Sequence, residues 1–330
     1  MCGRTACTLD QCKIQRATCQ YSKNKENLQW IQKYDWQNYQ TSYNMSPTQV
    51  CPVIVNAKSL AFEEKVDDHA LTLMRWGLVP SWFKGNLQEC PLKTNNCRYE
   101  SILEKPTFKG AASAGRRCIV LADGFYEWKE IGNKKKQPYF IYFPQEKEVF
   151  TQNRDSFFKE GEWKGPRLLT MAGLFDVWIS PQKESYYTFS IITLESSKTM
   201  AFVHCRMPAI LDGTDEVSMW LDTNRVPTKE AVSILKPIEN LQMHPVSSIV
   251  NNSRNNSIEC IKPYIEPDKK EIKNTGLTSW LIKGGNKVSP SASFNSHSSE
   301  CLEKKSNQST GLTSWLIKEN TPAKRFKPNS

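Results

Sequence analysis

Cys2 directly follows Met1, so removal of the initiator methionine would leave a cysteine as the first residue. An N-terminal cysteine carries an α-amine and a thiol on adjacent carbons. Their reference pKa values are about 8 and about 8.5, so a fraction of each group is nucleophilic at neutral pH. An aldehyde can form an imine with this amine, and the thiolate can then close a five-membered thiazolidine ring. The alternative interpretation is an ordinary cysteine that follows the initiator by chance.

Two other side chains have the chemistry to move the protons that imine formation requires. Glu127 stands between Tyr126 and Trp128, and a partly desolvated carboxyl group is a better proton donor near neutral pH. His204 is one of four histidines and stands in an apolar stretch that also contains Arg206. The alternative interpretations are a surface ion pair for Glu127 and a structural histidine for His204.

Polar, basic and aromatic residues together indicate a groove for nucleic acid. Asn96, Arg98 and Glu100 alternate, so in a strand all three would lie on one face. The basic residues close to Glu127 in the sequence are Lys109, Arg116, Arg117, Lys129 and residues 134–136. Tryptophans suited to stacking on bases are Trp76, Trp82 and Trp128. Trp82 is the predicted wedge against a base, and core packing is the alternative for the other two.

The composition agrees with a phosphate-bearing partner and argues against several classes of protein. Lys and Arg number 44 against 34 Asp and Glu, a net charge of +10, although a solvated surface would also account for this balance. No apolar run approaches the roughly 18–20 residues of a membrane span, so we expect no membrane contact. The opening residues lack the apolar segment of a signal peptide. The odd number of cysteines, 11, favours a reducing compartment over a disulfide framework.

The cysteines near the start of the chain raise the question of a metal site. Cys2, Cys7 and Cys12 are evenly spaced, at the margin of the spacing that zinc ligands adopt, but no matching pair follows in the sequence. Phosphate-loop and dinucleotide-binding glycine patterns are absent as well. We therefore predict neither a metal nor a cofactor.

The elements that must position these residues are mostly strands. Strands are predicted at 118–121, 139–143, 168–177 and 188–194, which are rich in Ile, Val, Phe, Tyr and Thr. Helices are predicted at 25–37, at 214–221 with Thr214 as N-cap, and at 229–235 with Thr228 as N-cap. Recurring strands with few long helices predict an α+β domain of mixed, largely antiparallel, curled and barrel-like sheets with a few flanking helices. We assign this domain to residues 1–262.

Residues 263–330 form a different region, rich in Ser, Asn, Lys and Glu, which we predict to be a disordered tail. The octapeptide GLTSWLIK occurs in it twice, at 276–283 and at 311–318. The predicted docking residues are Leu277, Trp280, Leu281, Leu312, Trp315 and Leu316. We expect either copy to bind the replication sliding clamp, although Gln308 lies one residue further from the apolar group than in the usual clamp-binding motif. A recent duplication that packs back onto the domain is the alternative.

Several motifs in the same order resemble one known family. They are the opening Cys-Gly-Arg, RWGLVPSW at 75–82, TNNCRYES at 94–101, ADGFYEW at 122–128 and HCRMPAIL at 204–211. Together they resemble the SRAP (SOS-response-associated peptidase) family over about two-thirds of the chain. Cys97 stands where the family has alanine, and Ile192 precedes Thr193 where the family usually has a pair of threonines.

The resemblance implies a role for each matching residue. Cys2 would attack the ring-opened aldehyde of an abasic deoxyribose in single-stranded DNA and form a thiazolidine crosslink. Glu127 would be the acid/base, His204 would assist ring opening and proton transfer, and Asn96 would position the substrate and the N-terminus. The implied or expected DNA contacts are Arg4, Arg98, Trp82, Arg116, Arg117 and Lys129.

The predicted function is therefore a self-crosslinking enzyme that shields abasic sites in single-stranded DNA from strand cleavage. It would lose Met1, with its own peptidase activity as one route, and act as a monomer in the nucleus, on chromatin at replication forks. Two alternatives remain open: a cysteine-dependent peptidase or amidohydrolase using Cys2 and His204, and a non-covalent reader of modified bases such as hydroxymethylcytosine.

Overall fold

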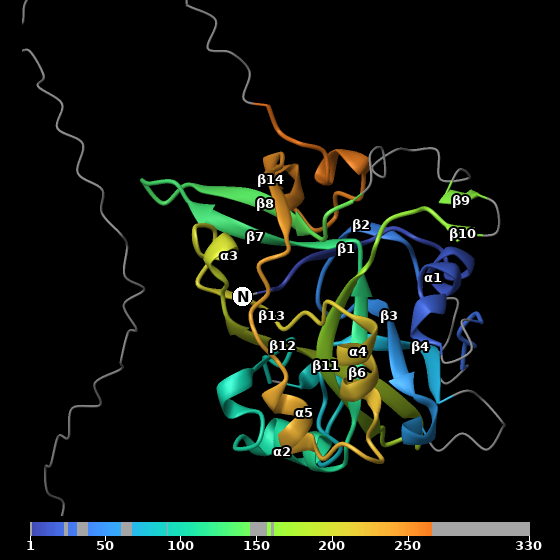
Figure 1. Cartoon of the computed structure of the whole chain (residues 1–330). Helices are drawn as coiled ribbons and strands as arrows, with labels where there is room; N and C mark the ends of the chain where they lie inside the picture. Colours follow the sequence, from blue (N-terminus) through green and yellow to red (C-terminus); the bar gives the residue numbers. More distant parts are fainter. Residues whose placement is uncertain are drawn as a thin grey trace, which may run out of the picture. The chain divides into compact units, whose positions relative to one another are not determined.

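Five strands close into a barrel in the computed structural model of this chain (Figure 1). In order around the barrel they are β11 (Leu169–Ile179), β6 (Arg117–Ala122), β3 (Val50–Asn56), β4 (His69–Trp76) and β12 (Ser185–Glu195), which pairs again with β11. All these neighbours are antiparallel except β12 and β4, which are parallel. The predicted mixed, largely antiparallel and barrel-like α+β fold is thus confirmed.

The structure describes residues 2–22, 26–31, 39–60, 68–90, 92–145, 157–159 and 162–265. All of them belong to the first of two units into which the chain divides, Met1–Lys273. The predicted docking repeats lie outside the described residues, and the domain boundary at residue 262 and the disorder of the tail stay predictions. Within the part described, no helix is long and apolar enough to cross a membrane.

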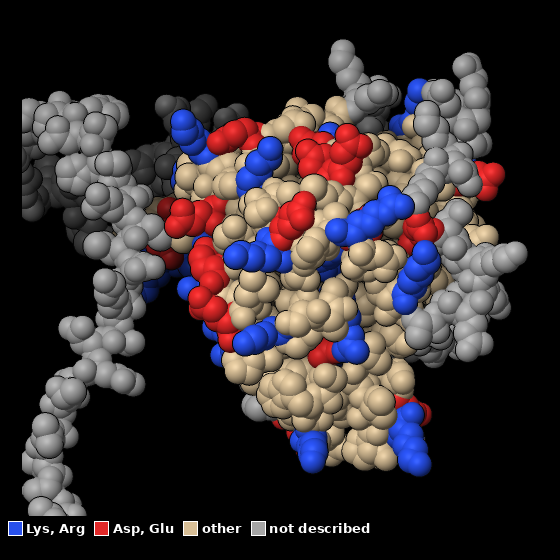
Figure 2. All heavy atoms as spheres, turned by 60° about the horizontal axis from the view of Figure 1, so that its bottom comes forward, with Lys and Arg blue, Asp and Glu red and all other residues tan. Residues whose placement is uncertain are grey.

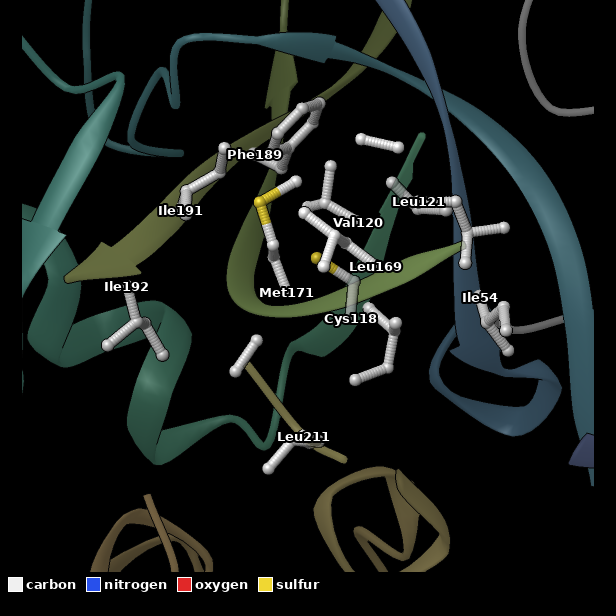
Figure 3. Packing of buried hydrophobic residues seen from close by; sticks show 14 of the residues in the cluster. Ile54, Cys118, Val120, Leu121, Leu169, Met171, Phe189, Ile191, Ile192 and Leu211 are labelled. Carbon is white, nitrogen blue, oxygen red and sulfur yellow. The ribbon is translucent and has the colours of Figure 1, made fainter. Parts of the chain in front are cut away.

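The barrel interior is filled by apolar side chains from every strand. All six residues of β6 are buried, and β12 has an unbroken buried run of eight, because strands inside a closed barrel that is covered outside by helices and loops have both faces shielded from water. Figure 3 shows Val120, Met171 and Phe189, from three different strands, lying close together. The β-branched and aromatic residues that predicted these strands are therefore the residues that pack the core.

A second sheet of five strands carries the start of the chain. Its order is β14 (Gln242–Pro245), β8 (Lys136–Tyr142), β7 (Gly124–Glu130), β1 (Thr5–Cys7) and β2 (Ser42–Met45). One face of it packs under the C-terminal segment of the described chain in a small core of its own. That core contains Ala6, Tyr126, Phe140, Tyr142, Val246, Val250, Ile258, Cys260 and Ile261.

The two sheets are joined by a corner at Asp123, between barrel strand β6 and sheet strand β7. The Asp123 carboxylate accepts hydrogen bonds from the Thr8 backbone N–H, at 3.0 Å, and from the Thr8 hydroxyl. The Asp123 N–H in turn donates to the Ala6 carbonyl at 2.7 Å. The corner therefore fixes β1, and with it the start of the chain, against the end of the barrel.

Short elements complete the fold. Two strands, β5 (Asn96–Arg98) and β13 (Arg206–Pro208), extend the end of β12, and β9 (Phe158–Lys159) pairs with β10 (Glu162–Trp163). The α-helices are α1 (Gln11–Ala17), α2 (Pro106–Ser113), α3 (Lys198–Ala201), α4 (Thr214–Leu221) and α5 (Thr228–Ser233). Single 3₁₀ turns occur at Cys19–Tyr21, Ala57–Leu60, Leu87–Glu89, Tyr99–Ser101, Ser248–Asn251 and Ile258–Cys260.

Two of the three predicted helices are present, and the third is wrong over the residues that the structure describes. Helix α4 has the predicted bounds and α5 lies within about two residues of them, but Gly213 and Pro227 occupy the N-cap positions predicted for Thr214 and Thr228. The helix predicted at 25–37 is wrong over residues 26–31, and its remainder is outside the described residues. Ile31 N–H donates to the Leu71 carbonyl at 2.7 Å, so this segment is an extended neighbour of β4.

Gly124, the first residue of β7, generates a prediction about stability. A Cβ there would collide with the Phe140 ring and lie 2.6 Å from the Ile141 carbonyl oxygen. Gly124→Ala should therefore lower the free energy of unfolding by about 3 kcal/mol, measured by urea denaturation. Gly110→Ala is the matched control, because its Cβ would meet nothing within 4 Å in helix α2. It should stabilise by about 0.5–1 kcal/mol; equal effects of the two changes would contradict this account.

Candidate active site

Cys2 is buried, with no exposed surface, where the second sheet meets the end of the barrel. The side-chain amide of Asn96, the first residue of β5, donates to the Cys2 carbonyl at 2.7 Å. Since β5 pairs with β12, this bond attaches the start of the chain to the barrel. In Figure 1 the N-terminus lies next to the labels of α3 and β13.

Glu127 approaches Cys2 from strand β7. Thr5 pairs with Phe125, and Tyr126 N–H donates to the Arg4 carbonyl at 2.9 Å, so the antiparallel register continues to place Glu127 beside residues 2 and 3. Glu127 is 3% exposed. The sequence prediction of a desolvated carboxyl group is therefore correct, and the surface ion-pair interpretation is not.

The thiol of Cys2 is held in its neutral form. Burial raises its pKa well above the ordinary value, and the nearby Glu127 carboxylate raises it further. The positive chain terminus and a hydrogen bond from the Arg4 backbone N–H oppose this with smaller effects. The expectation of a freely ionising thiol does not hold in this environment. The sulfur becomes nucleophilic only after it loses its proton, and Glu127 is a carboxylate within electrostatic reach.

His204 lies in the turn between α3 and β13 and is partly exposed. Its Nδ1 lies 3.0 Å from the backbone nitrogen of Arg206 and 3.1 Å from the Arg206 carbonyl oxygen. With the ring proton on Nε2, Nδ1 accepts from the Arg206 N–H and Nε2 is a hydrogen-bond donor, whereas with the proton on Nδ1 the ring donates to the Arg206 carbonyl.

The first turn of helix α3, which precedes His204, is held in place by hydrogen bonds to Glu239. The Glu239 carboxylate accepts from the Thr199 hydroxyl at 2.7 Å and from the backbone N–H groups of Lys198 and Thr199. The Thr199 bonds, followed by that from Lys198, lower the pKa of Glu239 to about 2. This carboxylate therefore stays charged at every pH at which the protein would work, and the turn that carries His204 remains anchored.

Arg206 joins the two short strands at the end of β12. Its guanidinium pairs with the Glu100 carboxylate, with 3.1 Å between Nη2 and Oε2, and also donates to the Thr193 carbonyl. Strand β5 ends at Arg98, and Glu100 lies in a 3₁₀ turn. The prediction that Asn96, Arg98 and Glu100 share one strand face is thus wrong for Glu100, which instead connects β5 to β13.

Comparison with known proteins decides the family. The sequence profile described as "SOS response associated peptidase (SRAP)" matches residues 1–253. The chain belongs to the SRAP family. It is 44% identical over 304 residues to the abasic site processing protein HMCES of Xenopus tropicalis, covering 90% of this chain and 89% of that protein. It is 32% identical over 228 residues to the abasic site processing protein YoqW of Bacillus subtilis, covering 68% and 88%.

A solved structure supports the fold. A protein from Bacteroides thetaiotaomicron superposes with a TM-score of 0.53 at 25% sequence identity, covering 68% of this chain and 86% of that one. The four residues that the SRAP resemblance assigns to catalysis come from β5, β7, the α3–β13 turn and the chain start. The structure connects Cys2 directly to Asn96 and electrostatically to Glu127.

The predicted DNA contacts differ widely in their surroundings. Arg98 is exposed, and Trp82 is 56% exposed in a loop that Asp176 holds by accepting from the Ser81 N–H at 2.8 Å. Trp76 is in the core. Trp128 is half-buried and donates from Nε1 to Asn251 Oδ1 at 2.7 Å.

Arg117 is a wrong prediction. Its side chain has no exposed surface, and its Nη2 donates to the carbonyls of Asp222 and Val226 at 3.0 and 2.9 Å. Its guanidinium carbon also lies 5.6 Å from the centre of the Trp220 ring. Arg117 therefore fixes the end of α4 against β6 and cannot reach a phosphate in this structure.

Two other predicted arginines are largely engaged within the protein. Arg116 forms an ion pair with Asp176, and its side chain is 32% exposed. The Nη1 of Arg4 donates to Asn44 Oδ1 and to the Val250 carbonyl, both at 2.7 Å. Arg4 thus connects the start of the chain to the C-terminal segment, a role that the sequence gave no reason to expect. Contact of either side chain with phosphate stays a prediction.

Charge on the surface is less segregated than a basic groove would suggest. On the face drawn in Figure 2, Lys and Arg side chains are interspersed with Asp and Glu. Among the described residues there is no group of three or more His, Cys, Asp or Glu side chains able to hold a metal ion.

Sequence reasoning missed three residues that position the site. Arg206 fixes β5 and β13, Glu239 anchors α3, and the Asn44 side chain donates to the carbonyls of Val250, Asn252 and Asn255. Each acts across a long stretch of chain, so no local spacing indicates it. Of these three residues, Arg206 is the one that the sequence could have indicated, because it lies within the HCRMP motif.

The electrostatic link between Glu127 and Cys2 can be tested by alkylation. Glu127→Gln removes a negative charge that raises the pKa of the Cys2 thiol, so the pKa should fall and iodoacetamide should modify Cys2 several-fold faster at a given pH. The readout is mass spectrometry of the N-terminal peptide over a pH series. Glu130→Gln, a change at an exposed position on the same strand, is the control and should leave the rate unchanged. A slower or equal rate in Glu127→Gln would remove the proposed coupling.

Proposed function

We propose that this chain processes abasic sites in DNA by linking itself to them through Cys2. The names of its SRAP relatives, abasic site processing proteins, support the substrate. The observation that carries the proposal is the bond from Asn96 to the backbone carbonyl of Cys2, which places the second residue of the chain at a buried polar site. A cysteine that merely followed the initiator would need no such anchor.

The chemistry follows from the side chains that surround Cys2. After Met1 is removed, the α-amine adds to the aldehyde of the ring-opened abasic sugar, and the carbinolamine loses water to give an imine. The thiol then adds to the imine carbon, while its proton passes by way of Glu127 to the nitrogen. The ring that forms is a thiazolidine, and the overall change is the loss of one water molecule.

Three residues share the remaining tasks. In the tautomer that carries its proton on Nε2, His204 is suited to donate toward the sugar ring oxygen during ring opening, while Nδ1 accepts from the Arg206 N–H. Asn96 keeps its Oδ1 buried and without a hydrogen-bond partner among the described residues, so it is suited to accept from the Cys2 amine. Glu127 alternates between acid and carboxylate, because it gives a proton to the departing water and takes one from the thiol, which it passes to the nitrogen.

The decisive experiment is a denaturing gel. Single-stranded DNA containing one uracil, treated with uracil glycosylase, should give a slow-migrating protein–DNA band with the mature chain. Cys2→Ala and a chain with one residue added before Cys2 should both give no band, since the first removes the thiol and the second moves the free α-amine to another residue. Cys12→Ala, at an exposed cysteine, is the matched control and should behave as the unchanged chain.

The other outcomes identify the alternatives. Binding without a covalent band in any variant would favour a non-covalent reader of modified bases. Hydrolysis of unrelated peptides, dependent on Cys2 and His204 and independent of DNA, would favour a cysteine peptidase or amidohydrolase. A band that persists in Cys2→Ala would show a lysine or another residue to be the nucleophile and would contradict the proposal.

We further propose that the chain acts as a monomer in the nucleus, on chromatin at replication forks, and that its tail docks to the sliding clamp. The repeated apolar octapeptide and the basic stretch at 323–327 support this. The two copies would act together through their high effective concentration.

Clamp docking can be tested in the intact chain. Changing both Trp280 and Trp315 to Ala should abolish recovery of the chain on immobilised clamp, because each removes the largest apolar side chain of its repeat. Changing one tryptophan alone should weaken recovery. Unaltered recovery with both changed would remove the docking proposal without affecting the crosslinking chemistry.

A further inference from the structure

An exposed aromatic ring lies beside the candidate active site, next to a lysine. Phe202, at the end of α3 and two residues before His204, is 49% exposed. Its ring packs edge-on against Tyr139, with 5.6 Å between ring centres. The ammonium group of Lys129 lies 4.7 Å from the centre of the Phe202 ring.

This cluster is connected to Glu127 by the sheet. In the β7–β8 register Tyr139 is paired with Glu127, and Lys129 is two residues along β7, so all three lie on one face. Phe202 packs on Tyr139 and therefore lies about one side chain from the catalytic carboxylate. A ligand whose sugar reaches Glu127 would bring its next unit close to Phe202.

The hairpin that carries Lys129 continues outward from the same place. In Figure 1 the β7–β8 hairpin extends beyond the other described elements, with α3 drawn below it. Its tip has positive φ angles at Gly132, Asn133 and Lys134 and is closed by bonds from Lys135 N–H to the Gly132 carbonyl, at 2.8 Å, and from Ile131 N–H to the Lys135 carbonyl, at 3.0 Å. Lys134 and Lys135 are exposed on this arm.

We infer that Phe202 and Lys129 form a nucleotide subsite next to the abasic position, in which a base stacks on the Phe202 ring while Lys129 contacts the adjoining phosphate. An aromatic face with a cation beside it is the combination that binds single strands without sequence preference. An ammonium group binds phosphate more strongly than it binds an aromatic ring. Lys129 would therefore leave the face of the Phe202 ring and pair with the phosphate. Lys134 and Lys135, exposed at the tip of the β7–β8 hairpin, would contact phosphates further along the same strand. This inference rests on the proposed function, because it takes an abasic strand as the ligand.

Non-covalent binding tests the subsite separately from crosslinking. The probe is a fluorescent single strand with a central tetrahydrofuran residue, an abasic analogue without an aldehyde, and binding is followed by anisotropy. Phe202→Ala should weaken binding about fivefold, and Phe202→Trp should preserve or tighten it. Lys129→Gln should weaken binding and lower the slope of log affinity against log salt by about 0.7, the value for one phosphate contact on a single strand.

A second set of strands shows whether the ring reads a neighbouring base. In these strands the base on the 5′ or the 3′ side of the analogue is also removed. The penalty of Phe202→Ala should disappear on one of the two and persist on the other, which also gives the strand polarity. Met219→Ala, at an exposed apolar position on α4, is the matched control and should bind every strand normally.

Several results would overturn the subsite. They are an unchanged affinity of Phe202→Ala, a loss that is equal on all strands, or a change in the sedimentation of the protein that marks Phe202 as a contact between copies. Failure of the proposed function would look different, since the Cys2→Ala chain would still bind these strands and only the covalent band would be missing from the unchanged chain.

Discussion

The hydrogen bond from the Asn96 amide to the Cys2 carbonyl is the constraint on which the rest of the site depends. Chain ends ordinarily fray, because their backbone groups have few partners. Here the end is held on three sides: by Asn96 from the barrel, by pairing of β1 with β7, and by Arg4 bonded to the C-terminal segment. A reaction that needs both an amine and a thiol at fixed positions requires this degree of order.

The burial that orders the start of the chain also makes the Cys2 thiol less reactive. Burial favours the neutral form of any acid, and the thiol of Cys2 also faces the Glu127 carboxylate. A protein that carries a permanently ionised thiol would react with many electrophiles. A neutral thiol beside a base reacts when a carbonyl carbon is already in place to receive it, so the same environment that slows ionisation favours selectivity.

The sequence was most informative where side chains act on their immediate neighbours. Ile, Val and aromatic residues predicted the barrel strands β6, β11 and β12, and β8 of the second sheet, because packed strands need such residues on their buried faces. The spacing of Leu28 and Ile31 resembled a helix, but both are buried in an extended segment beside β4, where tertiary pairing overrides local periodicity.

The sequence named candidate site residues but gave little information about how they are positioned. Motif resemblance selected Cys2, Asn96, Glu127 and His204, but the sequence did not separate an arginine that faces solvent from one such as Arg117, which is buried and donates from Nη2 to two backbone carbonyls. The partners of Arg4, Arg206 and Glu239 are far away in the chain, and only the closed fold brings them together.

The contacts of Asn44 and Arg4 with Val250 and its neighbours have a consequence for biosynthesis. The N-terminal strand acquires its last packing partner only when residues near 250 have left the ribosome, on the order of ten seconds or more after translation begins. Until then the first residues are open to the enzymes that trim and modify nascent chains, and afterwards they are enclosed. Under the proposed function, other enzymes that trim Met1 or modify the amine would therefore have their best access during synthesis.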